Sequence, residues 1–334
     1  MNRSEMAPKK KLIEQVAELL KKRGQRALEL AKESILQENI EFELLQEALR
    51  YFMEEVWEDV LHPALLSLAC EAVGGNPEST THVGVALVLL AGGADVHDDI
   101  IDQSTIKDSK QTVFGKFGTD ITLLVGDALL FKGLYVLHDA CETLPRNQKH
   151  SILELAKHGF FEIGTAEARE ASVKKKLYLR AEEYLNIIEK KVRVAEATVE
   201  MGAVLGNGTL DQIKAMGKYG KTLGMLMTIR DEFIDIFEPE ELRNRVEKEC
   251  LPLPILFTFK DSEKKKKITQ LLREGNITEK TVDQILELVM AAKGTLGLKE
   301  EMLSLIGEGI QQLGLIKKCK GQLQLLLKSA IEDL

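Results

Sequence analysis

The stretch that decides the fold class is residues 83–102, VGVALVLLAGGADVHDDIID. Its first twelve residues are nearly all apolar or small, which is typical of a helix that is buried on most sides. The stretch then turns acidic and carries carboxylates at Asp98, Asp99 and Asp102. We therefore expect a buried helix from about Glu78 to Asp102 with an acidic C-terminal end.

A second stretch repeats this arrangement. We expect a long helix over 210–237, in which an apolar segment is followed by residues 231–235, DEFID. Residues four apart lie on one helical face, so Asp98 and Asp102 project together, as do the first and last residues of DEFID. Like charges at this spacing repel, and at a helix C-terminus they also oppose the helix dipole. A hard divalent cation would neutralise them, and magnesium usually completes its coordination with water and substrate phosphates.

The remainder of the chain also favours helix. The sequence has 334 residues, 44% of them hydrophobic, but only 7 prolines and 5% aromatics, and its frequent Leu, Ala, Glu and Lys lose little rotamer freedom in a helix. Helical periodicity recurs from about residue 8 onward and is interrupted only by short glycine and proline clusters. We expect residues 1–334 to form one large all-α domain.

Charge and cysteine content exclude several classes of protein. The net charge of −8 disfavours a nucleic-acid partner. The 4 cysteines lie far apart and form no CxxC pair, which argues against a disulfide scaffold and a zinc site and favours the cytoplasm. The N-terminal segment lacks the apolar core of a signal peptide, and we identify no stretch that stays apolar over the roughly 20 residues of a membrane span. We expect a cytoplasmic protein without stable membrane insertion.

The two acidic segments, HDDIID at 97–102 and DEFID at 231–235, resemble the paired aspartate-rich motifs of the class I trans-prenyltransferases, the polyprenyl diphosphate synthase family. The second motif has Glu232 where the family has aspartate. Segments 68–75, 126–130 and 219–224 resemble further family segments in the same order. The likeness covers roughly residues 40–260.

This resemblance implies a bundle of long helices around a central cavity, usually as a homodimer, with three magnesium ions holding an allylic prenyl diphosphate. The implied metal ligands are Asp98, Asp99, Asp102, Asp231, Glu232 and Asp235. The implied catalytic residues are Asp98, Asp102, Asp231 and Lys191, of which the lysine matches a family residue that holds the diphosphate. The small Gly93 and Ala94, just before the first motif, imply a cavity deep enough for a long prenyl chain.

The second substrate expected from the resemblance is isopentenyl diphosphate, and the basic segment that binds it in the family is missing. Residues 57–63 read WEDVLHP, with acidic and apolar residues in place of lysine and arginine, whose loss removes charge-assisted bonds to a diphosphate. The implied substrate-binding residues are Lys107, Lys110, Lys191, Thr228, Arg245 and Lys248.

Three functions are therefore open from the sequence. The family match favours a magnesium-dependent synthase that condenses an allylic prenyl diphosphate with isopentenyl diphosphate. The missing basic segment favours a terpene synthase-like enzyme that uses no isopentenyl diphosphate. The third is a non-catalytic subunit of a heteromeric prenyl synthase, against which the intact carboxylates argue.

Overall fold

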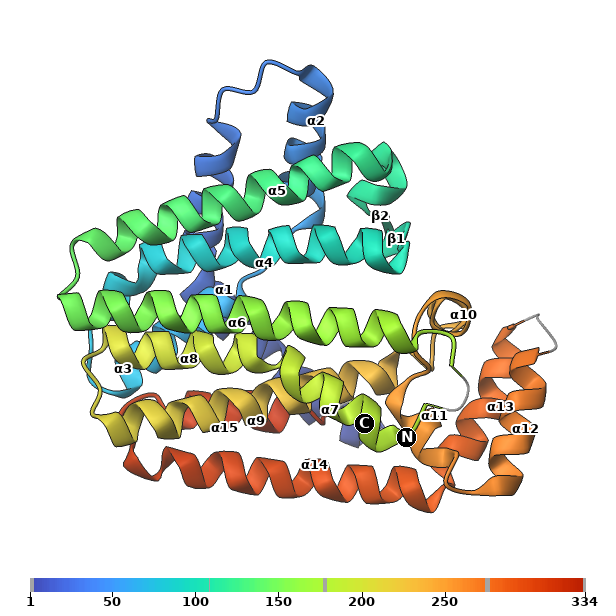
Figure 1. The fold of residues 1–334 in the computed structure, drawn as a ribbon. Helices are drawn as coiled ribbons and strands as arrows, with labels where there is room; N and C mark the ends of the chain where they lie inside the picture. Colours follow the sequence, from blue (N-terminus) through green and yellow to red (C-terminus); the bar gives the residue numbers. More distant parts are fainter. Residues whose placement is uncertain (1–2, 108, 177–178, 274–276, 333–334) are drawn as a thin grey trace. The chain divides into compact units, whose positions relative to one another are not determined.

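The computed structural model describes residues 3–107, 109–176, 179–273 and 277–332 (Figure 1). Within these ranges the chain is helical apart from turns, loops and one short hairpin, formed by β1 (Ile106–Lys107) and β2 (Lys110–Gln111). The expected all-α class is confirmed. The chain divides into two compact units, and each is described by itself. The expectation of a single domain over 1–334 stays a prediction.

The first unit comprises Met1–Gly159, Ala195–Gly220 and Leu313–Leu325. Its elements, some of which continue beyond it, are α1 (Arg3–Leu36), α2 (Glu43–Tyr51), η1 (Phe52–Val56), α3 (Leu61–Ala72), η2 (Pro77–Thr80), α4 (Thr81–Asp102), the hairpin, α5 (Val113–Glu142), α6 (Arg146–Val173), α8 (Arg193–Leu205), α9 (Leu210–Ile234), η3 (Leu313–Leu315) and α15 (Lys320–Ser329).

The second unit comprises Phe160–Val194, Lys221–Gln312 and Leu326–Leu334. Besides the remaining parts of α6, α8, α9 and α15, it contains α7 (Ala181–Lys191), α10 (Pro239–Lys248), α11 (Leu253–Thr258), α12 (Ser262–Arg273), α13 (Glu279–Met290) and α14 (Lys293–Gln312). Every residue of the short helix α11 is buried, and α11 packs against α7, α13 and α14. It therefore forms the core of this unit beside the end of α9.

Helix α4 is a core helix of the first unit, as its composition predicts, and it packs along α5. Glycines allow the two backbones to approach closely. A β-carbon on Gly93 would lie 2.8 Å from Leu130 Cγ, and one on Gly133 would lie 2.8 Å from Leu90 Cγ. Gly93 is thus small because α5 lies against it, which differs from the expectation that this position opens a cavity.

Within the part of the chain that the structure describes, two helices are long and apolar enough to cross a membrane by length and composition, namely α5 and the segment Pro77–Asp102 that contains α4. This corrects the expectation that no stretch stays apolar for that length. The apolar part of α4 is mostly buried inside the protein, as in the core helix of a globular domain, whereas that of α5 is only one third buried. The exposed face of α5 therefore needs a separate explanation.

Candidate active site

The first acidic motif occupies the last turn of α4. Asp98 and Asp102 are half-buried, one turn apart on the same face, whereas Asp99 is buried with 5% of its surface exposed. The helix ends at Gln103, whose left-handed backbone (φ 54°) turns the chain towards the hairpin. The sequence thus places the carboxylates correctly at a helix end.

Asp99 has an unfavourable electrostatic environment. Burial, followed by the neighbouring carboxylates of Asp95 and Asp102, raises its pKa to about 7, and Lys107 only partly opposes this. Because like charges and desolvation act together here, a bound divalent cation would relieve the cost of ionising this cluster. The donor set of the first motif therefore fits a magnesium ion.

The hairpin that follows the first motif carries two of the expected substrate-binding residues. Lys107 and Lys110 lie directly opposite each other in the antiparallel pair, where like charges destabilise a hairpin. Lys107 Nζ lies 2.5 Å from Asp95 Oδ1, and Lys110 Nζ donates to the backbone oxygen of Glu55 at 2.7 Å. Both side chains are exposed, so an anion has access to them.

The second acidic motif lies where α9 ends and differs in its surroundings. Asp231 is exposed, with the Arg230 guanidinium 3.6 Å away, and Asp235 is half-buried. Glu232 is buried, with 5% of its surface exposed. Its carboxylate accepts hydrogen bonds on both oxygens from Arg245 Nη2 at 2.9 Å, from Tyr184 Oη at 2.9 Å and from the Leu253 backbone N–H at 2.7 Å.

Arg245 on α10 is the cation of this cluster. It is 7% exposed, and besides Glu232 it donates to Asp235 Oδ2 and to the Cys250 backbone oxygen, at 2.9 and 2.8 Å. Burial raises the pKa of Asp235 to about 7, opposed by Arg245. Arg245, expected to bind substrate, is therefore directed towards the motif itself.

Lys191 lies at the end of α7, half-buried. Its Nζ lies 2.5 Å from Glu170 Oε2 and 3.0 Å from Glu167 Oε1, both on α6. Burial tends to raise the pKa of Glu170, but Lys191 and other neighbours hold it below its ordinary value. The sequence analysis identified neither glutamate, nor Tyr184, because their contacts depend on how α6 and α7 pack.

The remaining expected substrate-binding residues lie on α9 and α10. Thr228 is half-buried on α9, and Lys248 is half-buried in the last turn of α10. The acidic segment before α3 has a structural explanation, because Asp59 Oδ1 accepts hydrogen bonds from the backbone N–H groups of Leu61 and His62 at the start of that helix. Its other oxygen lies 2.8 Å from His62 Nδ1.

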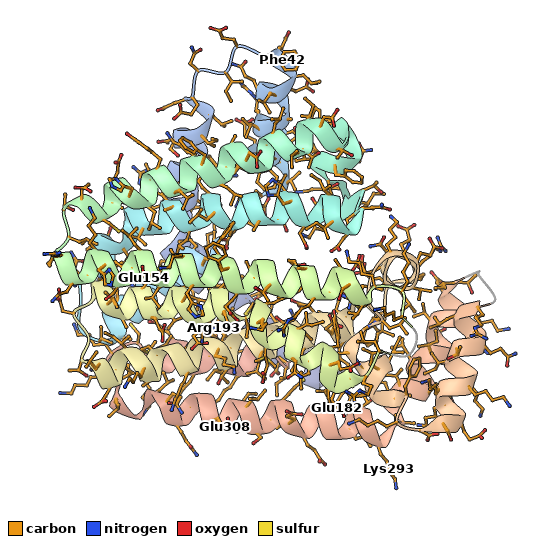
Figure 2. All side chains as sticks on the ribbon, in the orientation of Figure 1. Phe42, Glu154, Glu182, Arg193, Lys293 and Glu308 are labelled. Atoms are coloured by element: carbon orange, nitrogen blue, oxygen red, sulfur yellow. The ribbon has the colours of Figure 1, made fainter. Side chains whose placement is uncertain are left out.

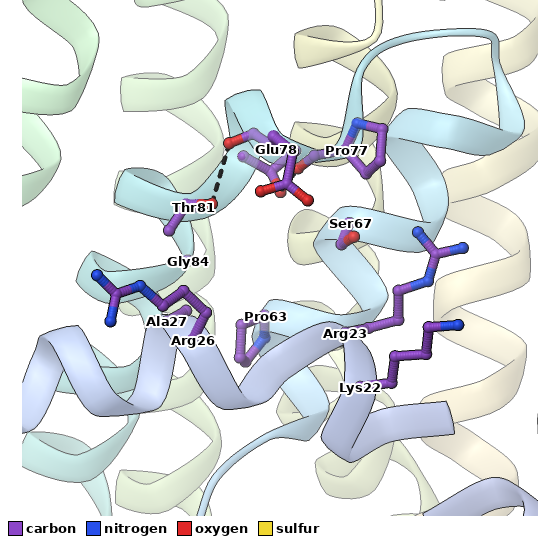
Figure 3. A pocket seen from close by; sticks show the side chains of 11 residues that line it. Lys22, Arg23, Arg26, Ala27, Pro63, Ser67, Pro77, Glu78, Thr81 and Gly84 are labelled. Carbon is purple, nitrogen blue, oxygen red and sulfur yellow. Dashed lines mark hydrogen bonds between the residues drawn. The ribbon is translucent and has the colours of Figure 1, made fainter. Parts of the chain in front are cut away.

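Among the described residues, two cavities at the surface bear on the location of the site. One of about 80 Å³ lies between α1, α3 and the start of α4, is lined by Lys22, Arg23 and Arg26 among others, and contains none of the expected site residues (Figure 3). The other, of about 450 Å³, is an open groove along α6 lined by Phe160, Phe161 and their neighbours. Only the second lies on a helix that carries partners of Lys191.

Neither motif forms a complete metal site from its own residues. Within the described ranges, no three histidine, cysteine, aspartate or glutamate side chains are grouped so that they would hold a metal ion. Magnesium takes one or two carboxylates and completes its shell with water and substrate phosphates, so a magnesium site here would require the diphosphate.

A sequence model described as polyprenyl synthetase matches residues 43–289, which include both motifs. The chain is 28% identical over 232 residues to a short chain isoprenyl diphosphate synthase of Methanothermobacter thermautotrophicus, covering 68% of each chain. It is 27% identical over 290 residues to a geranylgeranyl diphosphate synthase of Methanosarcina mazei, covering 85% of this chain and 87% of that one.

The fold is similar to that of solved structures. The geranylgeranyl pyrophosphate synthetase from Pyrococcus horikoshii superposes with a TM-score of 0.84 at 23% identity, covering 96% of this chain and 99% of that one. A polyprenyl synthetase from Streptomyces coelicolor gives a TM-score of 0.82 at 19% identity, with 95% and 99% covered. At this level of identity the likeness concerns the fold.

Proposed function

Because the chain belongs to the polyprenyl synthetase family and is a prenyl-transferring enzyme, we propose that it condenses an allylic prenyl diphosphate with isopentenyl diphosphate. The observation that carries this proposal is the pair of carboxylate motifs, each at the end of a buried helix and both inside the matched range. The relatives favour this reaction over the terpene synthase-like and non-catalytic alternatives.

We assign magnesium to the carboxylates of both motifs, with Asp98, Asp102 and Asp231 as principal ligands and Asp99 and Asp235 beside them. When bound, the metal neutralises the charge of the departing pyrophosphate. Lys191, oriented by Glu167 and Glu170, supplies a further positive charge to the diphosphate bound at the second motif. Glu232 is engaged by Arg245, so its contribution is to orient the motif.

The chain's apolar and basic side chains have separate tasks. The groove along α6 offers an apolar surface, formed by Phe160 and Phe161, on which the prenyl chain can lie. Lys107 and Lys110 on the hairpin replace part of the missing basic segment and donate to the diphosphate of the second substrate. Thr228 and Lys248 are assigned to the allylic diphosphate.

We propose that a second copy of the chain covers α5. Large apolar side chains on this helix are 48–75% exposed, which is unusual for a finished surface: Leu123, Leu124, Phe131, Leu134 and Tyr135. A cytoplasmic location is part of the proposal, because the cysteines lie far apart in the sequence and form no CxxC pair. Light scattering on the purified chain should give a dimer, and Phe131→Lys a monomer. A monomeric wild type that binds lipid vesicles through α5 would contradict this assignment.

The reaction itself is tested by incubating the purified chain and magnesium with labelled farnesyl or geranylgeranyl diphosphate, with and without isopentenyl diphosphate. Elongated product that requires isopentenyl diphosphate supports the proposal. Consumption of the allylic substrate alone supports the terpene synthase-like alternative, and binding without turnover supports a non-catalytic subunit.

A further inference from the structure

A buried chain of polar contacts connects Lys191 to the second acidic motif within the second unit. Lys191 Nζ lies 2.5 Å from Glu170 Oε2. The other oxygen of Glu170 lies 3.2 Å from the hydroxyl of Tyr184, which in turn lies 2.9 Å from Glu232 Oε1. Arg245 completes the chain by binding Glu232 and Asp235.

Tyr184 joins the two halves of this chain. Its side chain is buried, and its single hydroxyl contacts Glu170, Glu232 and Arg245 Nη2, the last at 2.9 Å. A tyrosine hydroxyl has one proton to donate and lone pairs to accept. It can therefore donate to a glutamate while accepting from the guanidinium, which keeps two buried carboxylates apart and in fixed positions.

Arg245 holds the motif from the other side. Its Nη2 binds Glu232, its Nη1 binds Asp235, and its Nε donates to the Cys250 backbone oxygen. The planar fork of arginine fixes several acceptors in one geometry, which the point charge of lysine does not reproduce. With its donors used inside the protein, this guanidinium is not directed at a diphosphate.

We propose that Tyr184 and Arg245 are positioning residues that fix Lys191 and the second acidic motif on one rigid frame before substrate binds. Neither residue touches the diphosphate; each acts through Glu170, Glu232 or Asp235. The inference rests on the proposed function, because it assigns the frame to the groups that hold the diphosphate and its magnesium.

Tyr184→Phe tests the inference against Tyr219→Phe, a matched control. Tyr219 is also a buried tyrosine, whose hydroxyl donates to the Leu323 backbone oxygen at 2.8 Å in the first unit. The magnesium concentration that gives half of the thermal stabilisation by inorganic pyrophosphate is measured first, because it needs no turnover. Tyr184→Phe should raise this magnesium concentration about 10-fold, which is the lower end of the effect seen when a partner of a metal ligand is lost. It should also lower kcat. Tyr219→Phe should change Tm only.

Arg245→Lys gives a second comparison, because it keeps the charge and loses the fork. We expect it to shift the magnesium requirement in the same direction as Tyr184→Phe. If both variants match Tyr219→Phe in magnesium requirement and kcat, the positioning role is wrong. If instead the wild-type chain neither turns over substrate nor gains thermal stability from magnesium and pyrophosphate, it is the proposed function that fails.

Discussion

The second residues of the two acidic motifs are equally buried, but the groups that surround their carboxylates differ in charge. Asp99 and Glu232 are both 5% exposed. At Asp99, burial and then the carboxylates of Asp95 and Asp102 raise the pKa to about 7, and Lys107 opposes this only in part. Around Glu232 the protein places a guanidinium, a phenol and a backbone N–H. The carboxylate of Asp99 is therefore balanced only in part, by Lys107, whereas that of Glu232 has donors on both of its oxygens. By contrast, exposed carboxylates such as Glu308 on α14 project away from the ribbon (Figure 2).

The extra methylene of Glu232 relative to aspartate explains part of this difference. The longer side chain reaches the Leu253 backbone N–H at the start of α11 and the guanidinium of Arg245 on α10. Glu232, which stands where the family has aspartate, is thus bound by Arg245 inside the protein. The exposed carboxylate of this motif is Asp231.

The largest effect on turnover is expected at the first motif, whose buried Asp99 faces other carboxylates. Asp98→Ala removes a metal ligand rather than a core contact. Loss of a residue that only supports a metal ligand lowers activity by up to about 100-fold, so turnover of Asp98→Ala should fall by more than this. The measurement is formation of labelled prenyl product at saturating magnesium. Circular dichroism should show unchanged helix content, and unchanged activity would refute the metal assignment.

At the second motif the largest effect should be on folding. Arg245→Met leaves Glu232 buried without its cation, and breaking a buried pair in this way costs about 3–5 kcal/mol. The free energy of unfolding in urea measures it. A loss below 1 kcal/mol, similar to that of an exposed ion pair, would mean that this cluster does not stabilise the fold.

Neutralising the two buried acids should change stability with opposite signs. Without magnesium at about pH 8, where Asp99 is ionised, Asp99→Asn removes a charge that is buried beside carboxylates and should raise the free energy of unfolding by at least about 1 kcal/mol. Glu232→Gln removes a charge that faces Arg245 and should lower it by about 1–3 kcal/mol. Paired urea titrations decide this, and shifts of the same sign would contradict the comparison.

The smallest effect concerns a third carboxylate that, like Glu232, serves the fold. Burial would raise the pKa of Asp59, but His62 holds it below its usual value; burial would lower the pKa of His62, but Asp59 raises it. The pair therefore stabilises the protein by about 1 kcal/mol between about pH 4 and 6.5. This stabilisation is lost below the window, where Asp59 gains a proton, and above it, where His62 loses one. Thermal unfolding against pH should show this loss on both sides, and His62→Asn should flatten it.

Much of the fold was predictable from residue patterns. The helix expected over 78–102 corresponds to η2 and α4, and that over 210–237 to α9, because long apolar stretches with acidic ends leave little ambiguity. The placement of carboxylates at helix ends followed directly. The burial of Arg245 did not, since a basic residue in a charged segment resembles a surface residue until α10 packs. Tyr184 and Glu170 have no local pattern at all.

The seam between α4 and α5 has a consequence for redesigning the product. Any β-carbon at position 93 would meet Leu130 and would also lie 3.0 Å from the Gly126 carbonyl oxygen. A larger residue at position 93 would force α4 and α5 apart. The enzyme would therefore lose stability before the length of its product changed. Engineering of chain length has more freedom at the neighbouring Ala94, which is only half-buried.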